Sequence, residues 1–366
     1  MFRVYMTQNK LVDVFIDELD AENHSDWFKV IRAQTEISLD EYEEDEEMDM
    51  NSPLFIIRKN NANLHFAQDD VIKKITNGDF ALALEHNPCG AYILDVTPDI
   101  AKGIQDGYGV ICESTSSLLD DTFLLTPNFP VDKAKNGKTW ERFPFNSKVP
   151  SNTLIIQDRF FCRSDRGESI QDTYENFDKI LRALLPMSFS ATYHVMVLYD
   201  DTRIEARDNV MFDDIAKQLN ILKDNVEKER GYPILLEILS IPNHSYNYNI
   251  THNRRILSNF YWIEAPHKLK AFRGTENLSD QSLVSKFLYA TENMPSNSIF
   301  GDEEPDNYID NHTKWINDFK GLVVASRSSG QYSSYNNNRY HPPVVYDFSV
   351  NGMPEPPSKI KNRILS

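Results

Sequence analysis

Short apolar blocks separated by polar stretches predict alternating strands and helices in the first half of the chain. Residues 2–6 (FRVYM) and 90–94 (GAYIL) are compact apolar runs typical of strands, whereas residues 11–19 (LVDVFIDEL) carry apolar side chains at helical spacing. Residues 67–75 (AQDDVIKKI) predict a helix, because the acids precede the lysines as the helix dipole favours. The apolar run at 52–60 (SPLFIIRKN) predicts a strand. Together these blocks indicate a small α+β domain.

The pattern becomes more regular from residue 151 onward. Three apolar runs, NTLIIQDRFF, TYHVMVLYDD and YPILLEILSI, predict strands, and the two amphipathic segments between them predict helices that end near Pro186 and Gly231. Successive strands joined by helices form right-handed crossovers, which place the strands parallel in one sheet. This half is therefore expected to be α/β, with a mixed, largely parallel sheet flanked by helices.

The chain is less regular after the third of these strands. Residues 252–274 predict a pair of strands, and residues 282–294 (SLVSKFLYATENM) predict a helix. The polar tail predicts irregular structure, apart from a strand-like piece at 321–326 (GLVVAS). Pro, Asn and Lys are frequent at 124–150, which favours a boundary there. We expect an N-terminal α+β domain at 1–150, an α/β domain at 151–295 and a polar C-terminal segment at 296–366.

The charge of the chain is strongly negative and concentrated in one place. The formal net charge is −17, and residues 36–49 (EISLDEYEEDEEMD) hold nine carboxylates and no basic residue. The negative charge argues against a general affinity for nucleic acid, because such binding relies on clustered Lys and Arg that release counterions. Carboxylates at this density repel one another, so we expect 36–49 to form a solvated acidic loop. It would serve as a solubilising insertion or as a mimic of a phosphate backbone.

Cysteine usage and hydropathy bound the cellular setting. Cys89, Cys112 and Cys162 are far apart and form no C-x-x-C pair, which predicts neither a disulfide framework nor a zinc site. No apolar run reaches the roughly 18 to 20 residues that a transmembrane helix needs, and the N-terminus lacks the order of a secretory signal. We expect a cytoplasmic protein without a metal or another cofactor.

Polar side chains follow the predicted parallel strands of the second half. Asp158 closes the first strand, Asp200 closes the second, and His252 lies a few residues beyond the third. Ligands of open α/β sheets bind outside the carboxyl ends of the strands. These groups and the guanidinium of Arg254 are therefore expected at one edge of the sheet.

The stretch HNRRILSN at 252–259, followed by GTEN at 274–277, resembles the motif of the phospholipase D superfamily, H-x-K-x-x-x-x-D followed by G-[ST]-x-N. The resemblance covers about residues 151–292 and implies a mixed sheet between helices. It also implies a set of roles: His252 as a nucleophile that becomes phosphorylated, Arg254 and Asn277 as a phosphate clamp, Thr275 as a hydroxyl donor, and Asn259 in the position of the supporting acid.

The chain departs from the family pattern at three points. Arg254 replaces a lysine, which keeps the charge but presents a longer, planar group. Asn259 replaces the acid, and loss of the acid from a serine-protease triad costs on the order of 10⁴ in rate. The segment between Asn259 and Gly274 is longer than in the family. These departures favour phosphate binding over turnover.

The family's active site pairs two motifs, and this chain has one. An active enzyme would therefore be a homodimer whose two copies of His252 meet across a twofold axis. The single, inactive phospholipase-D-like domain of certain midbody-associated proteins is similar, because its H-D-R core resembles residues 252–254 and it binds membrane phosphoinositides.

Three functions follow as alternatives. The first is a non-catalytic, degenerate module that binds a phosphate-bearing ligand, such as nucleic acid or a phospholipid head group, or a protein partner. The second is a homodimeric phosphodiesterase or nuclease that uses His252, and the third is a scaffold without a phosphate site. Arg159 and Arg163 would line the approach to a phosphate, or else pair with neighbouring acids. Tyr332, Tyr335 and Tyr340 in the Asn-rich tail resemble an adaptable protein-binding surface.

Other chemistries receive less support from the sequence. Asp200, Glu205 and Glu237 do not form the D-x(n)-E-x-K pattern of metal-dependent nucleases, and no P-loop, H-E-x-x-H or G-x-S-x-G motif is present. The aromatic run Phe260, Tyr261 and Trp262 alternates between the two faces of a strand, which predicts core packing. Stacking against nucleic-acid bases is the alternative for this run.

Overall fold

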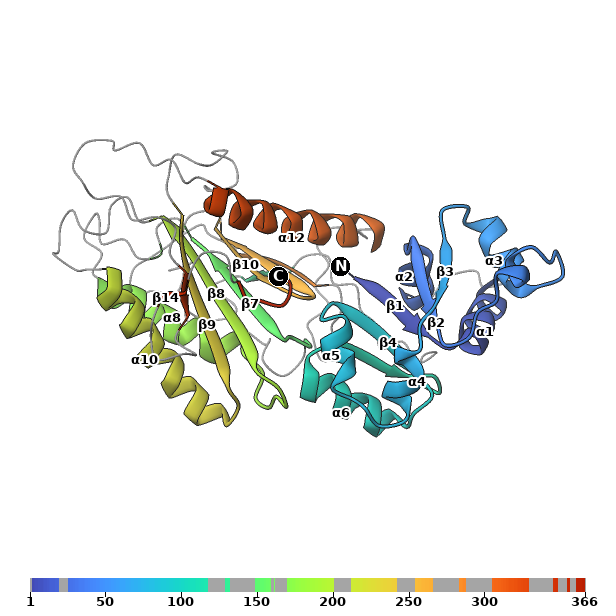
Figure 1. Cartoon of the computed structure of the whole chain (residues 1–366), viewed down its shortest axis with the longest axis horizontal. Helices are drawn as coiled ribbons and strands as arrows, with labels where there is room; N and C mark the ends of the chain where they lie inside the picture. Colours follow the sequence, from blue (N-terminus) through green and yellow to red (C-terminus); the bar gives the residue numbers. More distant parts are fainter. Residues whose placement is uncertain are drawn as a thin grey trace. The chain divides into compact units, whose positions relative to one another are not determined.

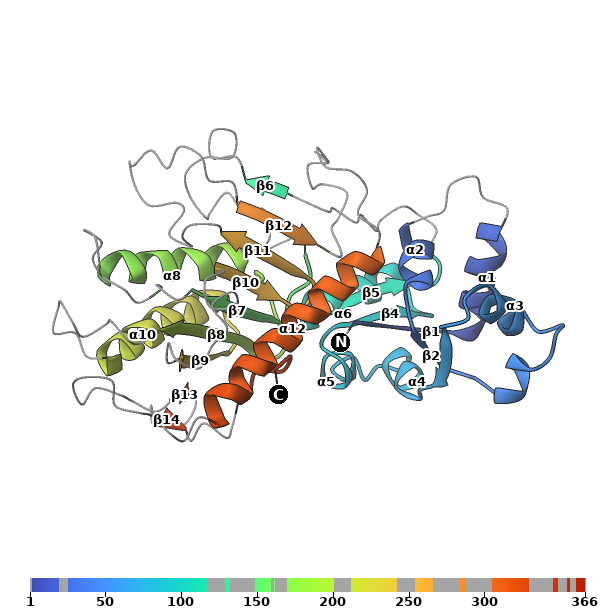
Figure 2. The same ribbon diagram turned by 90° about the horizontal axis from the view of Figure 1, so that it is seen from above.

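The computed structural model describes residues 2–19, 26–117, 129–131, 149–158, 161, 170–200, 212–241, 254–265, 283–287, 305–328, 345–347, 354–355 and 360–365. Contacts divide the chain into two compact units. The N-terminal unit consists chiefly of Met1–Pro127, and the C-terminal unit chiefly of Asn152–Lys286 and Lys314–Ser366. Figures 1 and 2 show the elements of both units.

Five parallel strands form the sheet of the N-terminal unit, in the order β3-β2-β1-β4-β5. Val4 of β1 stands opposite Ile37 of β2 and Ala91 of β4, and all three are fully buried. Apolar side chains of neighbouring strands therefore form a continuous core. The strands are β1 (Arg3–Met6), β2 (Glu36–Leu39), β3 (His65–Gln68), β4 (Gly90–Leu94) and β5 (Ile111–Ser114).

Two layers of helices cover this sheet (Figure 1). Helices α1 to α3 contact one another in one layer, and α4 to α6 do so in the other. Thr97 starts α6 by accepting the backbone N–H of Ile100, and Gly109 ends it with a left-handed backbone (φ 61°). The helices are α1 (Gln8–Leu19), α2 (Asp26–Arg32), α3 (Pro53–Asn60), α4 (Val71–Thr76), α5 (Leu82–His86) and α6 (Pro98–Tyr108), with a 3-10 turn, η1, at Glu44–Glu47.

The predicted strand at 52–60 is wrong, because this segment forms helix α3. The hydroxyl of Ser52 accepts the backbone N–H of Leu54 at 3.2 Å, and Pro53 occupies the first turn, where its missing N–H costs nothing. Leu54 and Ile57, three residues apart, bury the same helix face. The Ser-Pro pair ahead of the apolar run was the signal that favoured a helix.

The acidic stretch 36–49 is not a solvated loop throughout, which corrects the sequence-based expectation. Its first four residues form β2, beside the central strand of the sheet. Glu47 is buried, pairs with Arg58 of α3 and accepts the hydroxyl hydrogen of Tyr42. The carboxylates that do face solvent are Glu41, Glu43, Glu44, Asp45 and Asp49.

The α/β fold class is confirmed. For the N-terminal unit, we expected an α+β arrangement, but its strands are all parallel and alternate with helices. The unit is thus a doubly wound α/β sheet. Strand β3 has the sequence HFAQ, which has too few apolar residues to be recognised as a strand.

The C-terminal unit contains a nine-stranded mixed sheet, in the order β14-β13-β9-β8-β7-β10-β11-β12-β6. Strands β7, β8 and β9 are parallel, which confirms the predicted crossovers, and β10 pairs antiparallel with both β7 and β11. The strands are β6 (Phe129–Val131), β7 (Thr153–Gln157), β8 (Tyr193–Asp200), β9 (Ile234–Ile241), β10 (Arg254–Ser258), β11 (Tyr261–Ala265), β12 (Leu283–Phe287), β13 (Val345–Asp347) and β14 (Pro354–Glu355).

Helices α8 (Ile170–Leu184) and α10 (Phe212–Arg230) pack side by side on one face of this sheet, and the later part of α12 (Pro305–Ser328) lies over the other face (Figures 1 and 2). Gly231, with φ 78°, ends α10 where the sequence predicted it. The guanidinium of Arg255 lies 3.2 Å from the ring centroid of Trp315, so a cation–π contact ties α12 to β10.

Two predictions near the end of the chain are wrong. Strand β12 lies within the segment 282–294 that was expected to be helical, and the strand-like residues 321–326 belong to helix α12. The tail beyond 296 is therefore not irregular at 305–328. The tyrosines proposed for partner binding lie outside the described residues.

The aromatic run after β10 packs in the core, as predicted. Phe260, Tyr261 and Trp262 are each at most 2% exposed. Leu257, which stands opposite Trp262, and its partner on β7, Ile155, are also buried. Base stacking by this run is thereby excluded, because the rings are covered by protein.

Candidate functional site

Two of the residues predicted for the phosphate site, Arg254 and Asn259, belong to the described part of the chain. Arg254 is the first residue of β10, and Asn259 follows the last. The other predicted site residues lie outside the described ranges: His252, Thr275, Asn277, Arg159 and Arg163.

Arg254 forms an ion pair with Asp158 at the carboxyl end of β7. Because Arg255 stands opposite Gln157 in the antiparallel register, the two charged residues are neighbours across the strands. Arg254 Nε lies 3.3 Å from Asp158 Oδ1, and the side chains are only 11% and 3% exposed. The pair thus brings together a guanidinium and a carboxylate that we expected at this edge.

Asn259 lies at the opposite end of β10. Its Oδ1 accepts the backbone N–H of Asn152 at 3.1 Å and the hydroxyl of Ser258 at 3.0 Å, and the residue is 1% exposed. Asn259 lies five positions after Arg254, which corresponds to roughly 17 Å along an extended chain. In this unit, Asn259 joins the β10–β11 turn to the start of β7.

Three other residues that the sequence analysis considered are buried in the structure: Glu237, Cys89 and Cys112. Glu237 of β9 is buried, and its Oε1 accepts the backbone N–H of Lys361 at 2.7 Å. Cys89 and Cys112 are free, buried thiols, and burial raises the pKa of Cys112 well above its usual range. Among the described residues, no group of three acids, histidines or cysteines is arranged to hold a metal ion.

The N-terminal unit contains a cavity that we did not predict from the sequence. Its volume is about 500 Å³, which suits a small-molecule ligand. It lies at the carboxyl edge of the parallel sheet, where strand order reverses between β1 and β4. The lining comprises Thr7, Asn9, Lys10 and Asp13 at and within the start of α1, Asp40 after β2, Ile72, Lys73, Thr76 and Asn77 along α4, Asp95 after β4, and Thr115 and Ser116 after β5.

The first turn of α1 faces this cavity, and two of its backbone donors are engaged by side chains. The N–H of Gln8 donates to Asp40 Oδ1 at 2.9 Å, and the N–H of Lys10 donates to the Thr7 hydroxyl at 3.3 Å. Asp40 Oδ1 also accepts the N–H of Glu41 at 2.9 Å. The position where α/β sheets commonly hold a phosphate is therefore occupied by a carboxylate of the chain itself.

The charged groups of the cavity differ in their partners. Lys73 Nζ lies 3.0 Å from Glu41 Oε1, and this hydrogen bond raises the pKa of Lys73. Among the described residues, Lys10 forms no ion pair with a carboxylate. Asp13 and Asp95 are both exposed at the cavity. Of the two lysines in the described lining, Lys10 thus remains available to a ligand.

Hydroxyl groups gather on the β5 side of the cavity. Thr115 Oγ1 donates to Asp95 Oδ1 at 3.4 Å, and Ser116 Oγ lies 2.8 Å from Ser114 Oγ. On the α4 side, the hydroxyl of Thr76 donates to the carbonyl of Ile72 at 2.9 Å. Each of these hydroxyls keeps lone pairs that can accept a hydrogen bond.

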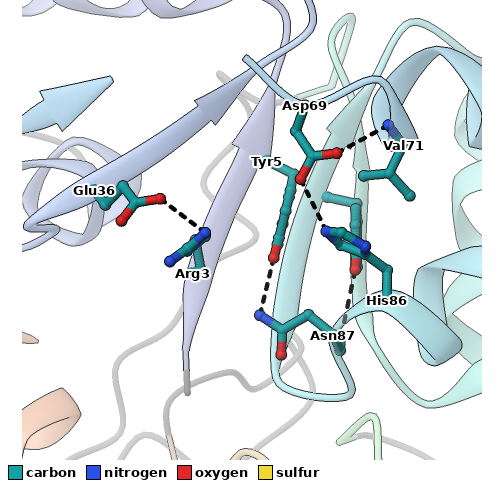
Figure 3. Close-up of polar contacts among 8 residues, drawn as sticks. Arg3, Tyr5, Glu36, Asp69, Val71, His86 and Asn87 are labelled. Atoms are coloured by element: carbon teal, nitrogen blue, oxygen red, sulfur yellow. Dashed lines mark hydrogen bonds and ion pairs between the residues drawn. The ribbon is translucent and has the colours of Figure 1, made fainter. Parts of the chain in front are cut away.

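A polar network on the sheet face holds α4 in position (Figure 3). His86 Nε2 lies 2.8 Å from Asp69 Oδ2, and Asp69 Oδ1 accepts the N–H of Val71 at 3.0 Å, at the start of α4. The Tyr5 ring meets the His86 ring edge-on at 5.4 Å and stacks on Tyr92 at 4.7 Å. The network therefore connects α5 and the sheet to the helix that lines one side of the cavity.

Burial of Tyr92 predicts sensitivity to alkali. Desolvation raises the pKa of its fully buried phenol far above 10, so the folded chain keeps the proton that the unfolded chain loses near pH 10. Stability from this group is present below pH 10 and is expected to fall by about 1.4 kcal/mol per pH unit above it. Urea unfolding of the Tyr92→Phe variant at pH 9 to 11 is expected to show a shallower decline. Tyr108→Phe, at a half-buried position on α6, should keep the original slope, and equal slopes in all three proteins would contradict this prediction.

The sequence indicates the cavity through polar residues that directly follow strands, but this indication can be recognised only once the strand order is known. Thr7, Asp40, Asp95 and Thr115 each directly follow a parallel strand. One of those strands, β2, was not recognised from the pattern, so the convergence of these residues could not be foreseen. None of the helices in the described part of the chain has the length and apolar character needed to cross a bilayer. No family model matches the chain, and no curated protein matches it.

Proposed function

We propose that the N-terminal unit binds a small polyhydroxylated ligand, such as a sugar or polyol, in the cavity at the carboxyl edge of its sheet. The observation that carries the proposal is the convergence of polar side chains from the ends of β1, β2, β4 and β5 on one cavity of about 500 Å³. This edge is where open α/β sheets bind their ligands.

The chemistry of the lining favours hydroxyl groups as the ligand's recognition elements. Thr76, Thr115, Ser116, Asn9 and Asn77 carry groups that both donate and accept hydrogen bonds. A ligand hydroxyl also does both, so it satisfies such partners. An ammonium group would only donate. The carboxylates of Asp13 and Asp95 add strong acceptors for ligand hydroxyls.

Dinucleotides fit the lining less well. Among the described residues of the lining, Ile72 is apolar and none is aromatic, so none of them can stack on a base. Asp40 Oδ1 accepts the N–H of Gln8 at the N-terminus of α1, so this backbone donor is not available to a pyrophosphate. The cavity therefore favours a ligand of monosaccharide size that is recognised through hydrogen bonds.

The experiment is ligand-observed NMR and calorimetry on the full chain with D-ribose, D-glucose and myo-inositol. We expect binding of at least one of them, and a loss of about tenfold in affinity for Asp95→Asn, because a carboxylate acceptor is removed. Asp79→Asn, an exposed change outside the cavity, is the matched control and should bind normally. Binding of NAD in place of all three polyols, or binding unaffected by Asp95→Asn, would overturn the proposal.

A second proposal concerns the C-terminal unit, which we infer to be a degenerate phospholipase-D-like module that binds a phosphate-bearing ligand. The specific support is the guanidinium of Arg254 beside Asp158, at the carboxyl end of β7, on a sheet with parallel central strands. Arginine recognises phosphate through paired N–H donors. A protein partner and turnover by a homodimer are the alternatives.

Three measurements separate these alternatives. A phosphate-binding module predicts that inorganic phosphate and phosphoinositide-containing vesicles bind the wild type and not the His252→Ala/Asn277→Ala variant. A homodimeric enzyme predicts a dimer in solution and a phosphohistidine trapped on His252. A scaffold predicts that neither substitution changes any binding, which would refute a phosphate site.

A further inference from the structure

We infer that the ligand of the N-terminal cavity carries one anionic group, a phosphate or a carboxylate, which is bound by Lys10. This inference rests on the proposed binding of a polyhydroxylated ligand and adds the charge that the ligand must bear. The ligand class is accordingly a sugar phosphate or a sugar acid.

The position of Lys10 carries the inference. Lys10 lies in the first turn of α1, where the positive end of the helix dipole disfavours a cation. It also lines the cavity and forms no ion pair within the described residues. A cation kept at an unfavourable helix position and facing a cavity is stabilised when an anion binds there.

The neighbouring charges assign the anion to Lys10 in preference to Lys73. The ammonium of Lys73 is already engaged with Glu41 at 3.0 Å. Asp40 is held by the backbone N–H groups of Gln8 and Glu41, which disperse its negative charge. An anion can therefore bind Lys10 without breaking the Lys73–Glu41 ion pair or the hydrogen bonds of Asp40.

The remaining acids orient the ligand. Asp95 and Thr115 lie after β4 and β5, whereas Lys10 lies on α1, which follows β1. Strands β4 and β5 lie to one side of β1 in the sheet, so Asp95 and Thr115 line the part of the cavity toward β5, whereas Lys10 lines the part at α1. An anionic group at α1 and hydroxyls toward Asp95 match this distribution of charge.

The test compares glucose 6-phosphate, gluconate and glucose on the full chain by calorimetry at 50 mM NaCl. We expect at least one of the two anions to bind about tenfold or more tightly than glucose, because charge-assisted hydrogen bonds are the stronger ones. The two anions distinguish a phosphate from a carboxylate. The advantage should shrink at 500 mM NaCl, since salt screens a partly exposed pair.

Lys10→Gln and Lys74→Gln provide matched variants. Lys74 is an exposed lysine on α4 that does not line the cavity, so its replacement should leave the preference intact. Lys10→Gln should remove the preference while glucose still binds. Equal affinity for all three probes, or a preference that survives in Lys10→Gln, would overturn the inference and leave polyol binding standing. Absence of binding by these probes and by D-ribose and myo-inositol to the folded wild type would reject both.

Discussion

Replacing Asp158 by alanine is expected to lower the free energy of unfolding of the C-terminal unit by about 3 to 5 kcal/mol. The substitution removes the carboxylate that pairs with Arg254 and leaves a guanidinium that is only 11% exposed. Removing one partner of a buried ion pair is costly, because little water can solvate the charge that remains. Chemical denaturation followed by circular dichroism on the full chain measures the effect.

A double variant separates the buried charge from other consequences of losing Asp158. Asp158→Ala combined with Arg254→Met removes both charges and keeps much of the apolar volume, so it is expected to recover most of the lost stability. The backbone of Asp158 is held independently, through its N–H to the carbonyl of Leu198 at 3.1 Å. A double variant as unstable as Asp158→Ala would show that the ion pair is not the cause.

Replacing Asn259 by leucine is expected to cost about 1 to 3 kcal/mol, because the N–H of Asn152 then loses its acceptor in a buried place. The hydroxyl of Ser258 loses the same acceptor but can rotate. The leucine has a similar volume, so packing changes contribute little. Urea denaturation of the variant gives the change in unfolding free energy.

Asn51→Leu, at an exposed position in the N-terminal unit, is the control and should have no comparable effect. Asn259→Ala, which leaves the same donor without an acceptor and also opens a cavity, should be at least as unstable as Asn259→Leu. A leucine variant as stable as the wild type would mean that the N–H of Asn152 finds another partner. The experiment also tests the phospholipase-D-like motif, because it measures whether Asn259, which stands where the family has an acid, has a structural role.

Elements whose end signals agree with their apolar pattern were predictable. Helix α6 has Thr97 and Pro98 at its start and Gly109 at its end, and α10 ends at Gly231. The order β7-α8-β8-α10-β9 follows from three apolar runs that are long enough to be unmistakable, and right-handed crossovers then make their strands parallel.

Two short apolar runs were predicted wrongly, because contacts with other segments determine their secondary structure. The residues GLVVAS are compatible with a strand, but they continue a helix that begins at Pro305. Strand β12 was expected to be a helix, yet Leu283 pairs with Val131 of β6, a segment more than a hundred residues away. Apolar runs of this length fit both the helical and the strand period, so strand pairing and packing determine whether a helix or a strand forms.

The residues of the candidate site in the N-terminal unit are brought together by the strand order and form no sequence motif. Lys10, Asp40 and Asp95 have no fixed spacing and match no short pattern. They meet because each follows, directly or within the next helical turn, a strand of one parallel sheet, and the carboxyl ends of such strands share an edge. The residues next to them in the sequence do not indicate that these three side chains line one cavity.

The sequence by itself determined the class of the fold, the crossovers of the C-terminal half and the helix ends, because these depend on periodicity and on caps within a few residues. The tertiary structure alone decided that Asp40 neutralises the start of α1, that Asp158 faces Arg254, and that a polar cavity opens beside Lys10. These contacts join residues distant in sequence, and their energies depend on burial and strand order, which local patterns do not encode.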